Sequence, residues 1–141
     1  MDPAASTEDH KRLVRRVYED FTNQRQLDLA EDLFSPDFVD HGAPATRHGV
    51  DGVKETTRAF LIAFPDFKFE IEAMVAEGDQ VHVRGTITGT QQGAYAGLPA
   101  SGKQARWSAM DDFRFENGKI AERWTERNRI ALLKQLGALP G

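Results

Sequence analysis

The sequence contains no cysteine among its 141 residues. A chain without cysteine forms no disulfide, no thiolate metal site, no iron–sulfur cluster and no cysteine nucleophile. The absence is typical of a reducing compartment, so we expect a cytoplasmic protein. A chain of this length buries a substantial core without covalent cross-links, and its size is that of one domain, residues 1–141.

The sequence also lacks long apolar runs and an excess of positive charge. No apolar run reaches the roughly 18 residues that a membrane span needs. Residues 1–6 have neither the basic region nor the apolar region of a signal peptide. Lys and Arg number 18 against 22 Asp and Glu, a formal net charge of −4. This balance does not indicate a nucleic acid or an anionic membrane as a partner.

Several motifs of cofactor chemistry are missing. The four histidines show no H-x-H, H-x₃-H or H-E-x-x-H spacing, so we expect no metal. The chain has no G-x-G-x-x-G after a strand, no Walker loop and no G-x-S-x-G. The two glycines within the second expected strand, Gly85 and Gly89, indicate a bend or bulge rather than phosphate binding. We therefore expect no nucleotide, flavin or other cofactor and no serine-hydrolase chemistry.

The residues that are present predict an α+β fold. Apolar residues recur at helical spacing in the first half of the chain and alternate in the second half. The expected elements are a first helix that reaches about Phe21, helices at 26–34 and 50–64, an extended piece at 38–42, a loop at 42–47, strands at 67–75, 81–89, 104–116 and 119–128, and a helix around 130–136. Ser6-Thr7 is the N-cap candidate of the first helix, and Ser35-Pro36-Asp37 is expected to end the second. Helices followed by a meander of strands favour a curved antiparallel sheet wrapped by N-terminal helices, a cone-shaped α+β barrel.

The dipeptide Asn117-Gly118 predicts the register of the last hairpin. Asn-Gly between apolar residues is a strong signal for a two-residue type I′ turn. Glu116 then pairs with Lys119, and the sequence numbers of every later pair sum to 235. Because a slip of one residue would expose both tryptophans, the face that carries the aromatic residues is expected to be the core face.

This register places polar groups among the aromatic residues of the core face. They are Asp111, Glu122, Glu126 and Asn128. Carboxylates are seldom buried without a partner or a purpose. Two interpretations stay open: the groups are functional, or they are structural. In the structural case Glu122 pairs with Arg58, Arg47 or Lys54, and Asp111 bonds the indole N–H of Trp124.

A concave sheet face covered by helices would form a small-molecule pocket. The large residues expected to line it and to contact a substrate are Trp107, Trp124, Phe60, Phe64, Met74 and Leu98. In particular, we expect Trp107 and Trp124 to flank a planar aromatic ligand.

The histidines differ in their expected roles. His41 follows an apolar pair and precedes a glycine bend, so it is a candidate acid/base or hydrogen-bond donor in the pocket, or else a residue that holds the loop. His10 is expected in solvent on the first helix. His82 is expected on the polar side of its strand, at the surface or in a subunit interface.

Four stretches resemble the SnoaL-like family of small polyketide cyclases and their relatives. They are the stretch from Phe38 to His41, Phe64 to Phe67, Gly97 to Lys103, and Phe113 to Trp124. The resemblance covers about residues 8–137 and implies the cone-shaped fold shared with nuclear transport factor 2 and ketosteroid isomerase.

The resemblance also implies candidate chemistry. In the family's cyclases a carboxylic acid four residues after the tryptophan is the general acid/base of an aldol closure, and here that position is Asn128. Glu126 is the candidate to take over this role. Another branch of the family resembles cofactor-independent hydroxylases of anthracycline pathways, in which the substrate's own quinol activates molecular oxygen. In such a site Asn128 and His41 would donate hydrogen bonds, and Glu126 or Asp111 would be the base.

Three functional hypotheses follow from these residues and this resemblance. The first is hydroxylation of a polycyclic aromatic polyketide by molecular oxygen without a metal or flavin, and the second is an aldol ring closure. The third is a binding module without chemistry. The polar sheet face, expected to carry Arg84, Thr86, Arg106 and Arg127, suggests a homodimer formed through the sheets.

Overall fold

The computed structural model describes residues 6–42 and 47–140 of the chain. Residues 1–5, which lack signal-peptide features in the sequence, and most of the loop expected at 42–47 lie outside the described residues. In the described ranges no helix is long and apolar enough to cross a membrane.

The first helix begins where the sequence predicted. Ser6 caps it, with its hydroxyl oxygen accepting from the Asp9 backbone N–H at 3.1 Å and the Asp9 carboxylate accepting from the Ser6 N–H at 3.2 Å. This reciprocal capping satisfies two backbone donors at the helix start. The helices are α1 (Thr7–Arg16), the π-helix η1 (Val17–Thr22), the short 3₁₀-helix η2 (Leu27–Leu29), α2 (Ala30–Leu33), α3 (Gly49–Ala63) and α4 (Arg129–Gln135).

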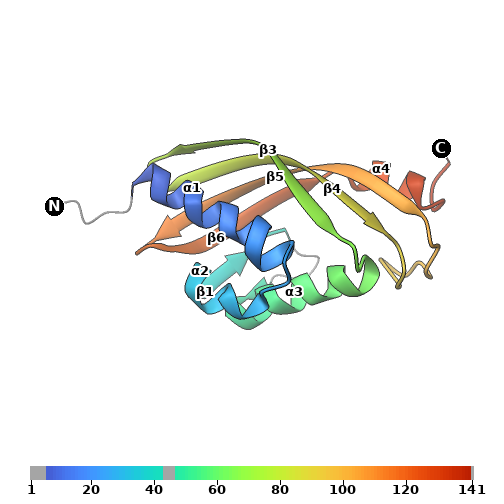
Figure 1. Cartoon of the computed structure of the whole chain (residues 1–141), viewed down its shortest axis with the longest axis horizontal. Helices are drawn as coiled ribbons and strands as arrows, with labels where there is room; N and C mark the ends of the chain where they lie inside the picture. Colours follow the sequence, from blue (N-terminus) through green and yellow to red (C-terminus); the bar gives the residue numbers. More distant parts are fainter. Residues whose placement is uncertain (1–5, 43–46, 141) are drawn as a thin grey trace.

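The strands form one curved sheet that helices cover on its concave side (Figure 1). They are β1 (Phe34–Asp40), β2 (Arg47–His48), β3 (Lys68–Glu77), β4 (Gln80–Thr90), β5 (Gln104–Glu116) and β6 (Lys119–Arg127). Their order is β2-β1-β6-β5-β4-β3, so the sheet is open at β2 and β3. Neighbours pair antiparallel except β1 and β6, which are parallel. The predicted α+β class is confirmed.

The segment expected as a helix over 26–34 is shorter in the structure. It ends at Leu33, and β1 continues through Pro36, which the sequence analysis placed after the helix as its terminator. Phe34 and Phe38 are both fully buried, and their side chains pack with ring centroids 4.8 Å apart. The register of β1 against β6 shifts between Phe34 and Val39, so Pro36 lies where the ladder is irregular and its missing N–H costs no regular hydrogen bond.

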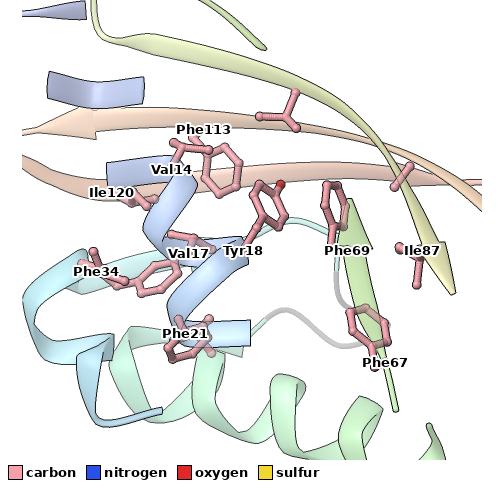
Figure 2. Packing of buried hydrophobic residues seen from close by; sticks show 14 of the residues in the cluster. Val14, Val17, Tyr18, Phe21, Phe34, Phe67, Phe69, Ile87, Phe113 and Ile120 are labelled. Atoms are coloured by element: carbon pink, nitrogen blue, oxygen red, sulfur yellow. The ribbon is translucent and has the colours of Figure 1, made fainter. Parts of the chain in front are cut away.

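The core lies between the first helices and the concave face of the sheet. Figure 2 shows side chains of α1 and η1 pointing toward the aromatic residues of the sheet, with Tyr18 near Phe69 and Phe113. The Tyr18 ring stacks on Phe69 at 3.9 Å between centroids and meets the edge of Phe113 at 5.9 Å. Tyr18 therefore reaches the middle of the sheet, where the functional site lies.

The expectation that His10 faces solvent is wrong. Its ring is 6% exposed and stacks on Phe115 with centroids 4.2 Å apart. The end of β5 covers the first turns of α1, which the helical pattern alone did not reveal. The buried Nδ1 of His10 has no hydrogen-bond partner among the described residues.

Gly85 is required by close packing rather than by an unusual backbone angle. A Cβ at this position would lie 2.3 Å from a ring carbon of Phe69 and 2.6 Å from the backbone oxygen of Glu70. The adjacent strand shifts register between Ile71 and Ala73, which agrees with the expectation that this glycine indicates a bend or bulge.

We predict that Gly85→Val lowers the free energy of unfolding by about 1–3 kcal/mol, the usual cost of overpacking a core. Thermal and urea unfolding would measure it. Thr88→Val, on the opposite face of the same strand, is the control and should unfold close to the parent. Equal stability of both variants would contradict the packing described for Gly85.

Candidate active site

The hairpin between β5 and β6 has the predicted turn but not the predicted register. Phe115 pairs with Ile120 and Glu116 with Lys119, as Asn117-Gly118 indicated. The next pair is Arg114 with Glu122, so Ala121 is an extra residue in β6. This is a β-bulge, and it moves every later side chain of β6 to the opposite face of the sheet.

The bulge overturns the expected core face of β6. Glu122, Trp124 and Glu126 pair with outward-facing residues of β5 and lie on the outer face of the sheet. Trp124 is 40% exposed and Glu126 is exposed. The prediction that both tryptophans and these two glutamates face the core is therefore wrong for all of them except Trp107.

Two inward-facing arginines of β6 take the place of the expected residues, and each pairs with a buried aspartate. Arg123 Nη2 donates to Asp40 Oδ2 at 2.5 Å, and Arg127 Nη2 donates to Asp111 Oδ2 at 3.1 Å. Asp40 and Asp111 are each 1% exposed. Because buried charges need partners, these pairs explain why β6 turns its arginines inward.

Asp111 lies on the inner face, as predicted, but its oxygens are occupied. Tyr18 donates its hydroxyl to Asp111 Oδ2 at 2.5 Å, in addition to the bond from Arg127. Burial, followed by the negative charge of Asp111, raises the pKa of Tyr18 well above its ordinary value. Tyr18 therefore stays protonated and remains a hydrogen-bond donor to Asp111.

Asp40 also remains in one protonation state near neutral pH. Burial by itself raises the pKa of this carboxyl. The charge and hydrogen bond of Arg123, with a further bond from the Gly42 backbone N–H, outweigh burial and leave the pKa below its ordinary value. Both arginines are thus held by ionised or hydrogen-bonded carboxylates at the base of a cavity.

The cavity is an open pocket of about 440 Å³, within the range of small-molecule sites. Its walls come from α3, the loop after β4, the inner faces of β5 and β6, the end of β1, and α4. The lining residues are Asp40, Gly42, Thr56, Ala59, Phe60, Ala94, Tyr95, Ala96, Trp107, Arg123, Thr125, Arg127, Arg129 and Leu132. A smaller chamber of about 50 Å³ shares Thr56, Phe60, Arg123 and Arg127 with it and reaches Tyr18.

Of the residues expected to contact a substrate, Phe60 and Trp107 line this pocket. Phe64 is fully buried behind it, with its ring 5.3 Å from Trp107 and 5.5 Å from Tyr95 between centroids. Phe64 thus orients two lining rings without lining the pocket itself. Met74 packs partly buried against the core away from the pocket lining.

Leu98 supports the pocket through its backbone. It exchanges two backbone hydrogen bonds with Tyr95, which closes a tight turn that presents Ala96 to the pocket. The fully buried Gln91 anchors this loop, with its side chain bonded to the backbone oxygens of Gly93 and Leu98 and to Ser101. Gln91 could not be recognised from the sequence, because nothing local marks a polar residue as the anchor of a loop.

The remaining predicted catalytic residues lie outside the pocket lining. The exposed His41 stacks on Trp124 at 5.0 Å between centroids, and its Nε2 is 2.8 Å from Glu122 Oε2. Arg114 bonds the other oxygen of Glu122 at 2.6 Å. Asn128 is exposed and caps α4, with its side-chain oxygen accepting from the Ala131 N–H at 3.1 Å. These positions do not place His41, Glu126 or Asn128 against a molecule in the pocket.

The site is therefore an aromatic-walled pocket with a guanidinium-rich base. Within residues 6–42 and 47–140, no three His, Asp or Glu side chains are grouped so as to hold a metal ion. The sequence signals for the missed arginines are the consecutive apolar pair Ile120-Ala121, which fits a bulge, and the inward Asp111, which needs a cationic partner.

The chain is an α+β domain with a curved, helix-covered sheet, and its pocket has the size and aromatic lining of a small-molecule site. The family model of the SnoaL-like polyketide cyclases matches residues 12–136, and the chain belongs to this family. No curated protein matches the sequence.

Three solved structures from Streptomyces illustrate the relationship. AclR of Streptomyces galilaeus, a candidate hydroxylase, is 32% identical, with 96% of this chain and 85% of that chain covered and a TM-score of 0.84. TsrD of Streptomyces laurentii is 26% identical, with 96% and 100% covered and a TM-score of 0.89. IdmH of Streptomyces antibioticus, a candidate polyketide cyclase, is 26% identical, with 90% and 97% covered and a TM-score of 0.78.

We predict that Asp40→Asn destabilises the protein at neutral pH by about 3–5 kcal/mol, because it leaves buried Arg123 without its anion. The pKa of Asp40 is lower in the folded than in the unfolded chain, so its contribution is complete above the ordinary aspartate pKa of about 3.9 and is lost as the pH falls through the folded value. Urea unfolding between pH 2 and 7 should show a weaker acid dependence in the variant, roughly over the range where aspartates titrate.

The control for this variant is Asp32→Asn, at an exposed position. It should unfold like the parent at every pH. If Asp40→Asn were as stable as this control at neutral pH, the ion pair with Arg123 would not hold β6 in its place.

Proposed function

We propose that the protein is a tailoring enzyme of aromatic polyketide biosynthesis that hydroxylates a polycyclic substrate with molecular oxygen, without metal or flavin. The observation that carries the proposal is the pocket itself, in which aromatic walls meet a base of two half-buried arginines, each paired with a buried aspartate. Membership of the polyketide cyclase family and the similarity to a candidate hydroxylase support the same substrate class.

The walls suit a planar aromatic molecule. Trp107 is held in place by Phe64 and Phe67, with ring centroids 5.3 and 6.4 Å away. Phe60 and Tyr95 add two further rings to the lining. Aromatic rings offer stacking area and a fixed orientation to a flat ligand. Trp124 takes no part in this stacking, because it lies on the outer face of the sheet.

The base of the pocket favours the anionic form of a substrate. Each of Arg123 and Arg127 donates to its aspartate through Nη2, so other N–H donors of both guanidiniums remain for a ligand. Donors fixed in a site of low polarity stabilise a developing phenolate or enolate strongly. A nearby positive charge lowers the pKa of a phenol, so the substrate anion forms without a strongly basic side chain.

The oxygen chemistry then balances on a quinol substrate. The quinol anion gives its electrons to molecular oxygen, which adds to a ring carbon as a hydroperoxide. Loss of water leaves the hydroxylated quinone. One oxygen atom enters the product, the other leaves as water, and the quinol supplies the two electrons that this second atom needs. The substrate proton passes to solvent through the open pocket, because Arg123 holds Asp40 in its ionised form.

A cyclase is the second candidate function, and the family's name and the similarity to IdmH favour it. Aldol closure requires a group that exchanges protons. Asn128 does not exchange a proton near neutral pH, and its oxygen caps α4. Ring closure here would depend on Asp40 or on Tyr18, whose raised pKa makes it a poor proton donor.

We predict that incubation with a polycyclic quinol under isotopically labelled oxygen gas yields a product with one labelled oxygen atom, read by mass spectrometry. Arg127→Met should lower the turnover by about 10²–10³, the usual contribution of one oxyanion-stabilising donor. Arg106→Met, at an exposed position of β5, is the control and should keep the parent's turnover.

Arg127→Met also strands Asp111, so Arg127→Lys and the melting temperature of each variant are measured alongside. A folded Arg127→Lys with intermediate turnover supports a charge effect. A ring-closed product that forms without oxygen would favour the cyclase. A substrate that binds but is not converted would indicate a binding module without catalytic activity.

We also propose that the protein forms a homodimer through the outer face of the sheet. A row of paired residues crosses β3, β4, β5 and β6 and consists of Val75, His82, Asp112 and Trp124. The residues at its two ends, Val75 and Trp124, are apolar and exposed. Met110 adds a third, 58% exposed, on the same face. Arg127, which the sequence analysis counted on this face, lies inside the pocket instead.

We predict that sedimentation at micromolar concentration shows a dimer and that Met110→Lys converts it to a monomer, because a charge would be buried in the contact. Ile130→Lys, an equally exposed apolar position on α4, is the control and should stay dimeric. A monomeric parent protein would contradict this contact.

A further inference from the structure

One wall of the pocket carries a line of cations. Beyond the bulge, the inward side chains of β6 are Arg123, Thr125 and Arg127, and Arg129 follows at the start of α4. All four line the pocket. The facing wall, from α3 and the loop after β4, is largely apolar, with Ala59, Phe60, Ala94, Tyr95 and Ala96. A ligand held between these walls has one edge rich in oxygen and one edge of hydrocarbon.

In the described part of the chain, the arginines on this wall outnumber the carboxylates that pair with them. Asp40 pairs with Arg123 and Asp111 pairs with Arg127. No hydrogen bond or ion pair joins Arg129 to another side chain in the described part of the chain. Three guanidiniums against two carboxylates leave one formal positive charge. Arg129 is exposed, so this charge lies where the pocket opens to solvent.

We infer that the substrate is an acid: a polycyclic aromatic compound whose carboxylate pairs with Arg129 at the pocket opening while its ring oxygens face Thr125 and Arg127. The inference rests on the proposed function and gives its substrate a chemical class. The planar guanidinium fork matches a carboxylate in two parallel hydrogen bonds, which a methyl ester or an amide does not reproduce. Arg129 is thus a residue that determines specificity rather than a catalytic one.

Binding tests this without any turnover. In the Trp124→Phe background Trp107 is the sole tryptophan, and quenching of its fluorescence reports occupancy of the pocket. The probes are an anthraquinone carboxylic acid, its methyl ester and its carboxamide. We expect the acid to bind on the order of three- to tenfold more tightly than the ester or amide at low salt, the range of a partly exposed ion pair.

The preference should shrink as salt is added, because the pair is open to solvent. Arg129→Gln should abolish the preference while leaving the affinity for the ester unchanged. Arg106→Gln, a surface arginine outside the pocket, should keep the preference.

Three results would overturn the inference: acid and ester binding equally to the parent, Arg129→Gln retaining the preference for the acid, or a failure of all three probes to quench Trp107. The result for this inference is independent of the result for the hydroxylase proposal. Preferred binding of the acid without oxygen incorporation contradicts only the hydroxylase, and equal hydroxylation of acid and ester contradicts only the role of Arg129.

Discussion

The two ion pairs that join arginines of β6 to buried aspartates of its neighbours are the constraint on which the site depends. Arg123 with Asp40 joins β6 to β1, and Arg127 with Asp111 joins it to β5. An unpaired buried charge would cost several kcal/mol, so these pairs hold β6 in the bulged register once Ala121 is inserted. The same pairs leave guanidinium donors at the base of the pocket and turn Trp124 toward the outer face. A structural requirement of the sheet therefore also supplies the polar chemistry of the site.

The pocket combines this base with walls that are rigid for independent reasons. Trp107 is braced by Phe64 and Phe67, and the opposite loop is fastened by the buried amide of Gln91. A rigid aromatic slot loses little conformational entropy when it binds a flat molecule. Under the proposed function, the aromatic walls would select the shape of the substrate, the arginines would select its charge, and the substrate itself would supply the electrons for the oxygen chemistry.

Much of the fold could be predicted from local pattern, and most of the site could not. Ser6 as a cap, the Asn117-Gly118 turn and the alternation of β5 are local signals, and the structure confirms them. The bulge at Ala121 accompanies ion pairs with carboxylates of β1 and β5, which the pattern within β6 does not show, and one inserted residue reverses the face of every later side chain of β6. The predicted inward placement of Trp107 is correct because β5 carries no such insertion, whereas Trp124 and Glu126, predicted to face inward, lie on the outer face.

Engineered disulfides test the bulged register most directly, because the chain has no cysteine of its own. In the structure Met110 lies opposite Glu126, whereas the unbulged register places Ala109 there. We predict that Met110→Cys with Glu126→Cys oxidises to an intrachain disulfide, since paired residues have the Cα separation that the bond needs. Ala109→Cys with Glu126→Cys should keep two free thiols, counted by mass after alkylation. A disulfide in the second variant and free thiols in the first would contradict the register, and with it the inward placement of Arg123 and Arg127.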